Sequence, residues 1–159
     1  MKAFTLVEIL VTILIFSFIV GGIYGVLNIS KTNYDANLIS LNLQRQARQG
    51  MSWLSREIRQ AKLSKIKPPE KDGNNNDIII FDTLDAAGIK YYVEAGQLKR
   101  KDPTGIVETK ANDITVLTLS SNGGNLKKIT LEASKTFFSG GKSHTLTFPL
   151  TEQVEVRNP

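Results

Sequence analysis

The sequence predicts an α+β fold in which one long N-terminal helix, transmembrane in its first half, packs by its second half on an antiparallel β-sheet. Residues 9–27 are apolar and uncharged, and nothing that breaks a helix follows before Pro68. Beyond Pro69 the chain consists of short β-like runs separated by turn residues. About 90 of the residues remain for a compact body, so we expect one globular domain on a stalk.

Composition restricts the function only loosely. The formal net charge of +5 permits binding to nucleic acid, anionic lipid or acidic protein without selecting among them. The sequence contains no cysteine, which excludes a disulfide framework and thiolate chemistry.

The apolar run is long enough to cross a membrane, since at about 1.5 Å per residue it spans a hydrocarbon core of about 30 Å. It exceeds the apolar region of an ordinary secretory signal, and no A-x-A cleavage site follows it. Lys2 precedes the run, so the positive-inside bias places the N terminus in the cytoplasm and the body outside. Glu8 is a costly charge in this setting, which indicates either a cationic partner on another molecule or a solvated position among lipid headgroups.

Residues 3–10 read Ala-Phe-Thr-Leu-Val-Glu-Ile-Leu, preceded by a lysine and followed by the apolar run. This motif resembles the N-terminal signal of type IV pilins and type II secretion pseudopilins, although the family usually has glycine where this chain has Ala3. The resemblance implies that a prepilin peptidase cuts between Ala3 and Phe4 and that the new amine on Phe4 is methylated. It also implies an assembly role for Thr5 and Glu8, in which the Glu8 carboxylate pairs with the terminal amine of a neighbouring subunit and sets the register of a filament.

Together, the pattern and the resemblance divide the chain into four parts. They are a leader (residues 1–3), a transmembrane and filament-core helix (4–27), an extension of the same helix (28–67) and an antiparallel β domain (68–159). The implied partners are other pilin or pseudopilin subunits, the prepilin peptidase and an inner-membrane assembly platform, with no cofactor and no metal. The implied location is the inner membrane, as a single-pass protein, and later an extracytoplasmic filament.

Glycines interrupt the second half of the apolar run. Gly21, Gly22 and Gly25 are candidates for helix packing, because Gly21 and Gly25 have the GxxxG spacing that lets helices approach closely. Alternatively they provide a flexible segment or are simply tolerated in a membrane helix. The helix should end near Lys67, because residues before a proline are pushed out of the helical region.

Spacings of three and four residues predict two apolar stripes on the helix beyond the membrane. Trp53 falls off both stripes and is assigned a rim position. The second stripe lies on a different side from the first and should face another molecule, such as a filament core. The first stripe, suited to packing on a sheet, comprises Leu43, Ala47, Met51, Leu54, Ile58 and Ala61, and the second comprises Tyr34, Leu38 and Leu41.

A basic face lies on the same part of the helix. A solvated surface with cations near the helix C terminus is the favoured interpretation. The alternatives are docking to an acidic neighbouring subunit or contact with nucleic-acid phosphates, of which the second is possible but not favoured. The face comprises Arg45, Arg48, Arg56 and Arg59, with Lys62, Lys65 and Lys67 beyond them and only Glu57 opposing.

The body should form a sheet with one dry face toward the helix. Residues 70–77 form a polar loop that we interpret as a turn, because the EF-hand pattern of calcium ligands fails there. Hairpin turns are expected at residues 95–96 and 121–124. Strands are expected at residues 77–81, 89–93, 97–101, 114–119, 126–133, 143–148 and 153–156.

No catalytic constellation is visible in the sequence. His144 is the only histidine, and a hydrogen-bonded sheet-edge position is favoured for it over a catalytic or metal role. The protein is therefore interpreted as non-enzymatic. The leading hypothesis is a structural subunit of a type IV pilus or type II secretion pseudopilus, and the alternative is a membrane-anchored or filament-tip binding module, either an adhesin or a DNA receptor, that uses the basic face.

Three weaker marks resemble J-type minor pseudopilins and W-type minor pilins, which favours a minor subunit over the major one. They are residues 56–61 (Arg-Glu-Ile-Arg-Gln-Ala), residues 91–93 with 98–100, and the closing Val156-Arg157-Asn158.

Overall fold

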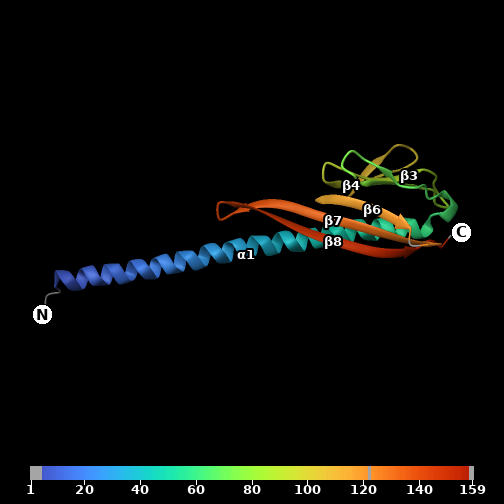
Figure 1. Ribbon diagram of the computed structural model, residues 1–159. Helices are drawn as coiled ribbons and strands as arrows, with labels where there is room; N and C mark the ends of the chain where they lie inside the picture. Colours follow the sequence, from blue (N-terminus) through green and yellow to red (C-terminus); the bar gives the residue numbers. More distant parts are fainter. Residues whose placement is uncertain (1–4, 122, 158–159) are drawn as a thin grey trace.

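A computed structural model describes residues 5–121 and 123–157. A single long helix, α1 (Leu6–Gln60), extends far beyond a body made of two antiparallel sheets (Figure 1). This arrangement confirms the predicted α+β fold. After the helix come a short 3-10 helix, η1 (Leu63–Lys65), and the strands β1 (Glu70–Lys71), β2 (Asp77–Phe81), β3 (Ile89–Glu94), β4 (Gln97–Lys101), β5 (Val107–Asn112), β6 (Ile114–Ser121), β7 (Leu126–Ser139) and β8 (Lys142–Glu155).

The two ends of α1 have opposite surroundings. Residues 6–31, the bare segment, are all exposed in the isolated chain. Residues 43–60, the bound segment, lie against the sheets. All six residues of the predicted first stripe are buried in the core, five of them on α1 and Ala61 directly after its end. The second stripe is exposed, as expected for a surface that does not face its own body, with Tyr34 64%, Leu38 49% and Leu41 63% exposed.

The helix ends at Gln60, seven residues before the predicted end at Lys67. The chain leaves the helix early because the edge of β2 offers it backbone hydrogen bonds. Lys62 N–H donates to the Asp82 carbonyl at 2.9 Å, and Lys67 N–H donates to the Ile80 carbonyl at 3.0 Å. Hydrogen bonding to a sheet edge therefore ends the helix before the prolines are reached.

The strands follow chain order in both sheets, β1-β2-β3-β4-β5 and β6-β7-β8. The predicted strands at residues 77–81 and 97–101 have the predicted bounds, while β1 and β5 were not predicted. The predicted strands at 143–148 and 153–156 are both parts of β8, which continues through Pro149. Proline is tolerated there because β8 is an edge strand that pairs only with β7.

The predicted turns are present. Ala95 and Gly96, with φ of 51° and 72°, join β3 to β4 as a two-residue hairpin of the type that needs positive φ at both positions. β6 pairs with β7 on either side of the turn expected at residues 121–124, of which Asn122 lies outside the described residues. The loop expected at residues 70–77 is partly strand: β1 and the start of β2 pair at its two ends, and residues 72–76 form the turn, in which the Asp72 carboxylate accepts from the N–H groups of Asn74 and Asn76, both at 2.8 Å.

The hairpin of β7 and β8 is longer than predicted and runs alongside α1 toward the bare segment (Figure 1). Its turn is Gly140-Gly141, with φ of 57° and 74°. Ser139 Oγ donates to Thr32 Oγ1 at 2.9 Å, which fixes the end of the hairpin to the helix. The body therefore reaches down the helix almost as far as the apolar run.

Candidate functional site

The first turn of α1 is closed by Thr5 and Glu8. Thr5 is the N-cap, and its hydroxyl oxygen accepts from the Glu8 N–H at 3.3 Å. In return, Glu8 Oε2 accepts from the N–H and from the hydroxyl of Thr5, both at 2.9 Å. The pair forms a capping box, which satisfies N–H groups that a helix start leaves without partners. This role was not predicted, although Thr-x-x-Glu ahead of an apolar run is its sequence signature.

The capping box leaves part of the Glu8 carboxylate available. Among residues 5–121 and 123–157, no group donates a hydrogen bond to Glu8 Oε1. Ala3 and Phe4, the predicted cleavage and methylation site, lie outside the described residues. The predicted pairing of Glu8 with the amine of a neighbouring subunit therefore stays a prediction, and the capping geometry is compatible with it.

The side chains of the bare segment are suited to an apolar environment. Two of its hydroxyl groups are bonded inside the helix: Thr12 Oγ1 donates to the Glu8 carbonyl at 2.7 Å, and Ser17 Oγ donates to the Ile13 carbonyl at 2.8 Å. Among the described residues α1 alone is long and apolar enough to cross a membrane, and none of its most apolar window is buried by the rest of the chain. Between Ile9 and Leu27 the segment therefore exposes apolar side chains on every side, a surface suited to lipid or to other helices.

Gly21, Gly22 and Gly25 lie within this surface. A Cβ atom added at any of them would have nothing within 4 Å in the single chain, and the helix continues unbroken through all three. The three glycines thus lie on a part of the helix surface that no other described residue covers. Close packing of a second helix on this surface stays a prediction.

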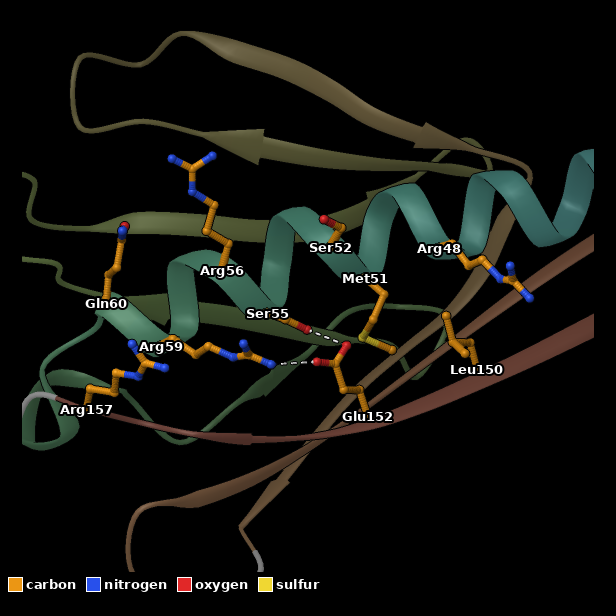
Figure 2. A pocket seen from close by; sticks show the side chains of 10 residues that line it. All are labelled: Arg48, Met51, Ser52, Ser55, Arg56, Arg59, Gln60, Leu150, Glu152 and Arg157. Carbon is orange, nitrogen blue, oxygen red and sulfur yellow. Dashed lines mark hydrogen bonds and ion pairs between the residues drawn. The ribbon is translucent and has the colours of Figure 1, made fainter.

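The predicted basic face is exposed, and three of its members line a groove between α1 and β8. The groove has a volume of about 590 Å³. Figure 2 shows Arg59 directed at Glu152, while Arg48 and Arg56 extend away from that carboxylate. Arg45 lies outside the groove. The lining residues are Arg48, Met51, Ser52, Ser55, Arg56, Arg59, Gln60, Leu150, Glu152 and Arg157.

Only one of the groove arginines is paired within the described part of the chain. Arg59 Nη2 donates to Glu152 Oε1 at 2.9 Å, and Ser55 Oγ donates to Glu152 Oε2 at 2.9 Å. Arg157 comes from the C-terminal end of the body, and its N–H donates to the Arg59 carbonyl at 3.2 Å. Its guanidinium extends the basic face, which was predicted on the helix alone, to the C-terminal end of the body.

Glu57 does not oppose the basic face as expected. It accepts two hydrogen bonds from Arg100 Nε of β4, at 2.9 and 3.1 Å. Burial, reinforced by the Glu57 carboxylate, raises the pKa of the neighbouring Tyr91 hydroxyl well above its usual value of 10. Burial alone would lower the pKa of Arg100, but its bonds to Glu57 raise it. This cluster fixes the bound segment to the sheet and leaves the basic face without an acidic neighbour on its own helix.

Trp53 lies at the rim, as predicted, and is 39% exposed. The Lys110 ammonium lies 4.2 Å from the centre of its indole ring, which is a favourable cation–π distance. A role in packing the edge of the body on the helix follows from this contact.

His144 lies on β8, where its ring stacks on Phe137 with centroids 5.5 Å apart. In the described residues, no group of three or more His, Cys, Asp or Glu side chains is close enough together to hold a metal ion. The polar loop at residues 70–77 uses Asp72 to accept from N–H groups within the loop, whereas Asp77 Oδ2 accepts from the Leu119 N–H of β6 at 2.6 Å. Its polar side chains thus connect the two sheets.

Comparison with known families gives one match. Residues 1–24 match the family model described as the prokaryotic N-terminal methylation motif. No curated protein and no solved structure matches the chain. The matched residues include the capping box and most of the bare segment, so the sequence motif coincides with the exposed apolar part of α1.

Proposed function

We propose that this chain, which carries the prepilin-type methylation motif of the type IV pilin and pseudopilin family, is a structural subunit of a type IV pilus or type II secretion pseudopilus. The observation that carries the proposal is the bare segment itself. It is a continuous apolar helix with no covering partner in its own described chain and with a carboxylate in its first turn. Motif and apolar helix together fit a membrane-anchored single-pass protein.

Processing by a prepilin peptidase would remove residues 1–3 and leave a methylated amine on Phe4. The N terminus then lies on the cytoplasmic side and the body outside, until an inner-membrane assembly platform extracts the subunit into a filament. In this proposal the protein has no enzymatic activity. The sequence marks at residues 56–61, at 91–93 with 98–100, and at 156–158 favour a minor subunit.

In the assembled state Glu8 would serve two partners at once. Oε2 closes the capping box with Thr5, and Oε1 accepts from the amine of Phe4 on the neighbouring subunit. A carboxylate and an amine buried together in an apolar core are stable only as a hydrogen-bonded pair, because each one alone carries a large desolvation cost. This pairing would make one axial register of the helices much more favourable than the others.

Two substitutions at Glu8 separate these roles. Glutamine can still close a capping box, whereas alanine cannot, and neither carries a charge. We expect Glu8→Gln and Glu8→Ala both to be processed and inserted in the membrane, and both to be lost from filaments, as measured by immunoblotting of sheared filament fractions. Normal incorporation of Glu8→Gln would show that Glu8 acts through the capping box alone and would contradict the charge-pair proposal.

A second candidate function, binding of an acidic ligand, is favoured by the groove between α1 and β8. Four arginines line it against a single carboxylate, that of Glu152. The distinguishing measurement is binding of double-stranded DNA by the full chain in nanodiscs at several salt concentrations, because phosphate contacts give a steep salt dependence. Binding that Arg48→Ser and Arg56→Ser weaken would support a DNA receptor, and absence of binding would leave the structural subunit.

A further inference from the structure

We propose that the tip of the β7–β8 hairpin, residues 137–142, rests on the anionic headgroup layer of the membrane that α1 spans. The inference rests on membrane insertion of the bare segment, which is part of the proposed function. It adds a second membrane contact, made by the globular body, that the N-terminal motif does not contain.

One hydrogen bond shows how far along α1 the tip reaches toward the membrane. Ser139 Oγ donates to Thr32 Oγ1 at 2.9 Å. Thr32 follows Leu27, the end of the apolar run, by five residues, which in a helix correspond to about 7.5 Å. The headgroup and interfacial region of a bilayer extends about 5–8 Å beyond the hydrocarbon on each side. The tip is therefore held at the outer boundary of the headgroups.

The side chains at this height match a membrane interface. Phe138 is 79% exposed, the largest exposed fraction among the large hydrophobic residues of the described chain. Lys142 is exposed across the same turn, and Lys31 is exposed on the helix next to Thr32. Aromatic rings and lysines are the residues that interfacial regions favour, since the ring enters the headgroup layer and the ammonium meets lipid phosphates.

The tip cannot easily withdraw Phe138 from solvent by folding back. Gly140-Gly141 forms a two-residue turn, and the strand pairing continues up to it, with Phe138 opposite Ser143 and Ser139 opposite Lys142. Strand alternation places Phe138 on the opposite face from Phe137, which is half-buried and stacked on His144. Membrane helices tilt by about 20° on average, and a tilt toward the hairpin brings this face of the tip into the headgroups.

Charge favours lipid over a second copy of the chain as the occupant. The tip contains Lys142 and no acidic residue, and Lys31 adds a further positive charge beside it. The nearest acidic residue on α1 beyond Thr32 is Asp35, about one turn further from the membrane. Anionic lipid attracts lysines close to its surface, whereas a second copy would bring the same two lysines together.

The test uses the absence of native cysteine, which allows a single nitroxide label anywhere in the chain. The label is attached to Ser143→Cys, opposite Phe138, in the full chain reconstituted at low protein content in phosphatidylcholine vesicles with phosphatidylglycerol. Collisions with oxygen, which enters lipid, are compared with collisions with a water-soluble nickel chelate. Gln153→Cys is the matched control, because it lies on the same exposed face of β8, about 33 Å further along the strand.

We expect the oxygen-to-nickel collision ratio to be severalfold higher at position 143 than at position 153. The ratio at 143 should fall to the control value with Phe138→Ser, and Lys142→Ser should remove its rise with phosphatidylglycerol content. Equal ratios at 143 and 153, or a difference that disappears when the protein is diluted further in lipid, would overturn the proposal. A label at Ile15→Cys reports insertion separately: lipid exposure there without exposure at 143 would refute the hairpin contact while leaving the membrane span intact.

Discussion

The bare segment and the bound segment belong to one continuous helix but solve different packing problems. In the bound segment the apolar residues form one stripe, and the body covers it, so that Leu54 is 0% exposed. In the bare segment apolar residues surround the helix, and Leu10 remains 58% exposed. A striped helix needs a partner on one side, whereas a helix that is apolar all round needs surroundings on every side. Within the described residues, therefore, the bound segment has its partner and the bare segment has none.

The largest expected difference between the segments concerns loss of an apolar side chain. Leu54→Ala leaves a cavity between helix and sheets and should lower the free energy of unfolding of the body by about 2–5 kcal/mol. Ile15→Ala, in the bare segment, should leave that free energy unchanged. Urea titrations followed by Trp53 fluorescence in detergent micelles compare the two. A similar loss from both would show that the bare segment also supports the body.

The next largest expected difference between the segments concerns replacement of a glycine by alanine. A Cβ atom at Gly50 would lie 3.0 Å from Leu98 Cδ2 and 3.2 Å from Ala111 Cβ, whereas one at Gly25 would meet nothing within 4 Å. Gly50→Ala should therefore destabilise the body by about 1–2 kcal/mol, since overpacking exceeds the gain in helix propensity. Gly25→Ala should not affect the body but should reduce incorporation into filaments. Thermal melts and filament yield check the two expectations, and a Gly50→Ala protein as stable as wild type would contradict the packing.

Alkaline pH should weaken the bound segment through Tyr91. Burial, together with the Glu57 carboxylate, raises its pKa in the folded state, so deprotonation favours the unfolded chain once the pH exceeds about 10. The contribution of Tyr91 to the free energy of unfolding is fully present below pH 10 and declines above it, by about 1.4 kcal/mol at pH 11. Tyr91→Phe, which keeps the ring stacked on Phe81, should abolish this part of the decline. Equal declines in both proteins would show that other groups cause it.

The smallest effect is expected at the exposed ion pair that borders the groove. Arg59 and Glu152 are 45% and 35% exposed, so their pairing contributes about 0.5 kcal/mol and is weakened by salt. Arg59→Ala should lower stability by this amount at low salt. Arg48 has no ion-pair partner among the described residues, so Arg48→Ala should have no effect, and a loss at Arg48 equal to that at Arg59 would contradict the assignment.

Local patterns predicted the helix, its apolar stripes and most of the strands, because these depend on spacing along the chain. The end of the helix could not be predicted from Pro68-Pro69 alone, since hydrogen bonds to Ile80 and Asp82 compete with the helix only after the sheet has formed. Strand β5 was missed because Val-Glu-Thr-Lys-Ala-Asn shows little apolar alternation. β8 was divided because Pro149 is unfavourable in a central strand, and nothing in the sequence shows that this strand is at an edge.

The candidate sites, like the fold, combine features that the local sequence predicts with features that depend on tertiary contacts. Glu8 could be selected from the sequence because a charge in an apolar run is costly, whereas its bonds to Thr5 needed either the structure or recognition of the capping pattern. The pairing of Glu57 with Arg100, and the addition of Arg157 to the basic groove, join residues that are far apart in the sequence. Such contacts depend on the tertiary fold and leave no local signal.

Site-specific photo-cross-linking in assembled filaments tests most directly whether the bare segment contacts other subunits. Benzoylphenylalanine would be placed at Ile13 in the bare segment and, as a control, at Leu84, an exposed residue of the body. We predict that the probe at Ile13 links the chain to other subunits in filaments and only to lipid in the membrane form. Links from Ile13 to lipid alone in both states would contradict the proposal that the bare segment is a packing surface for other subunits.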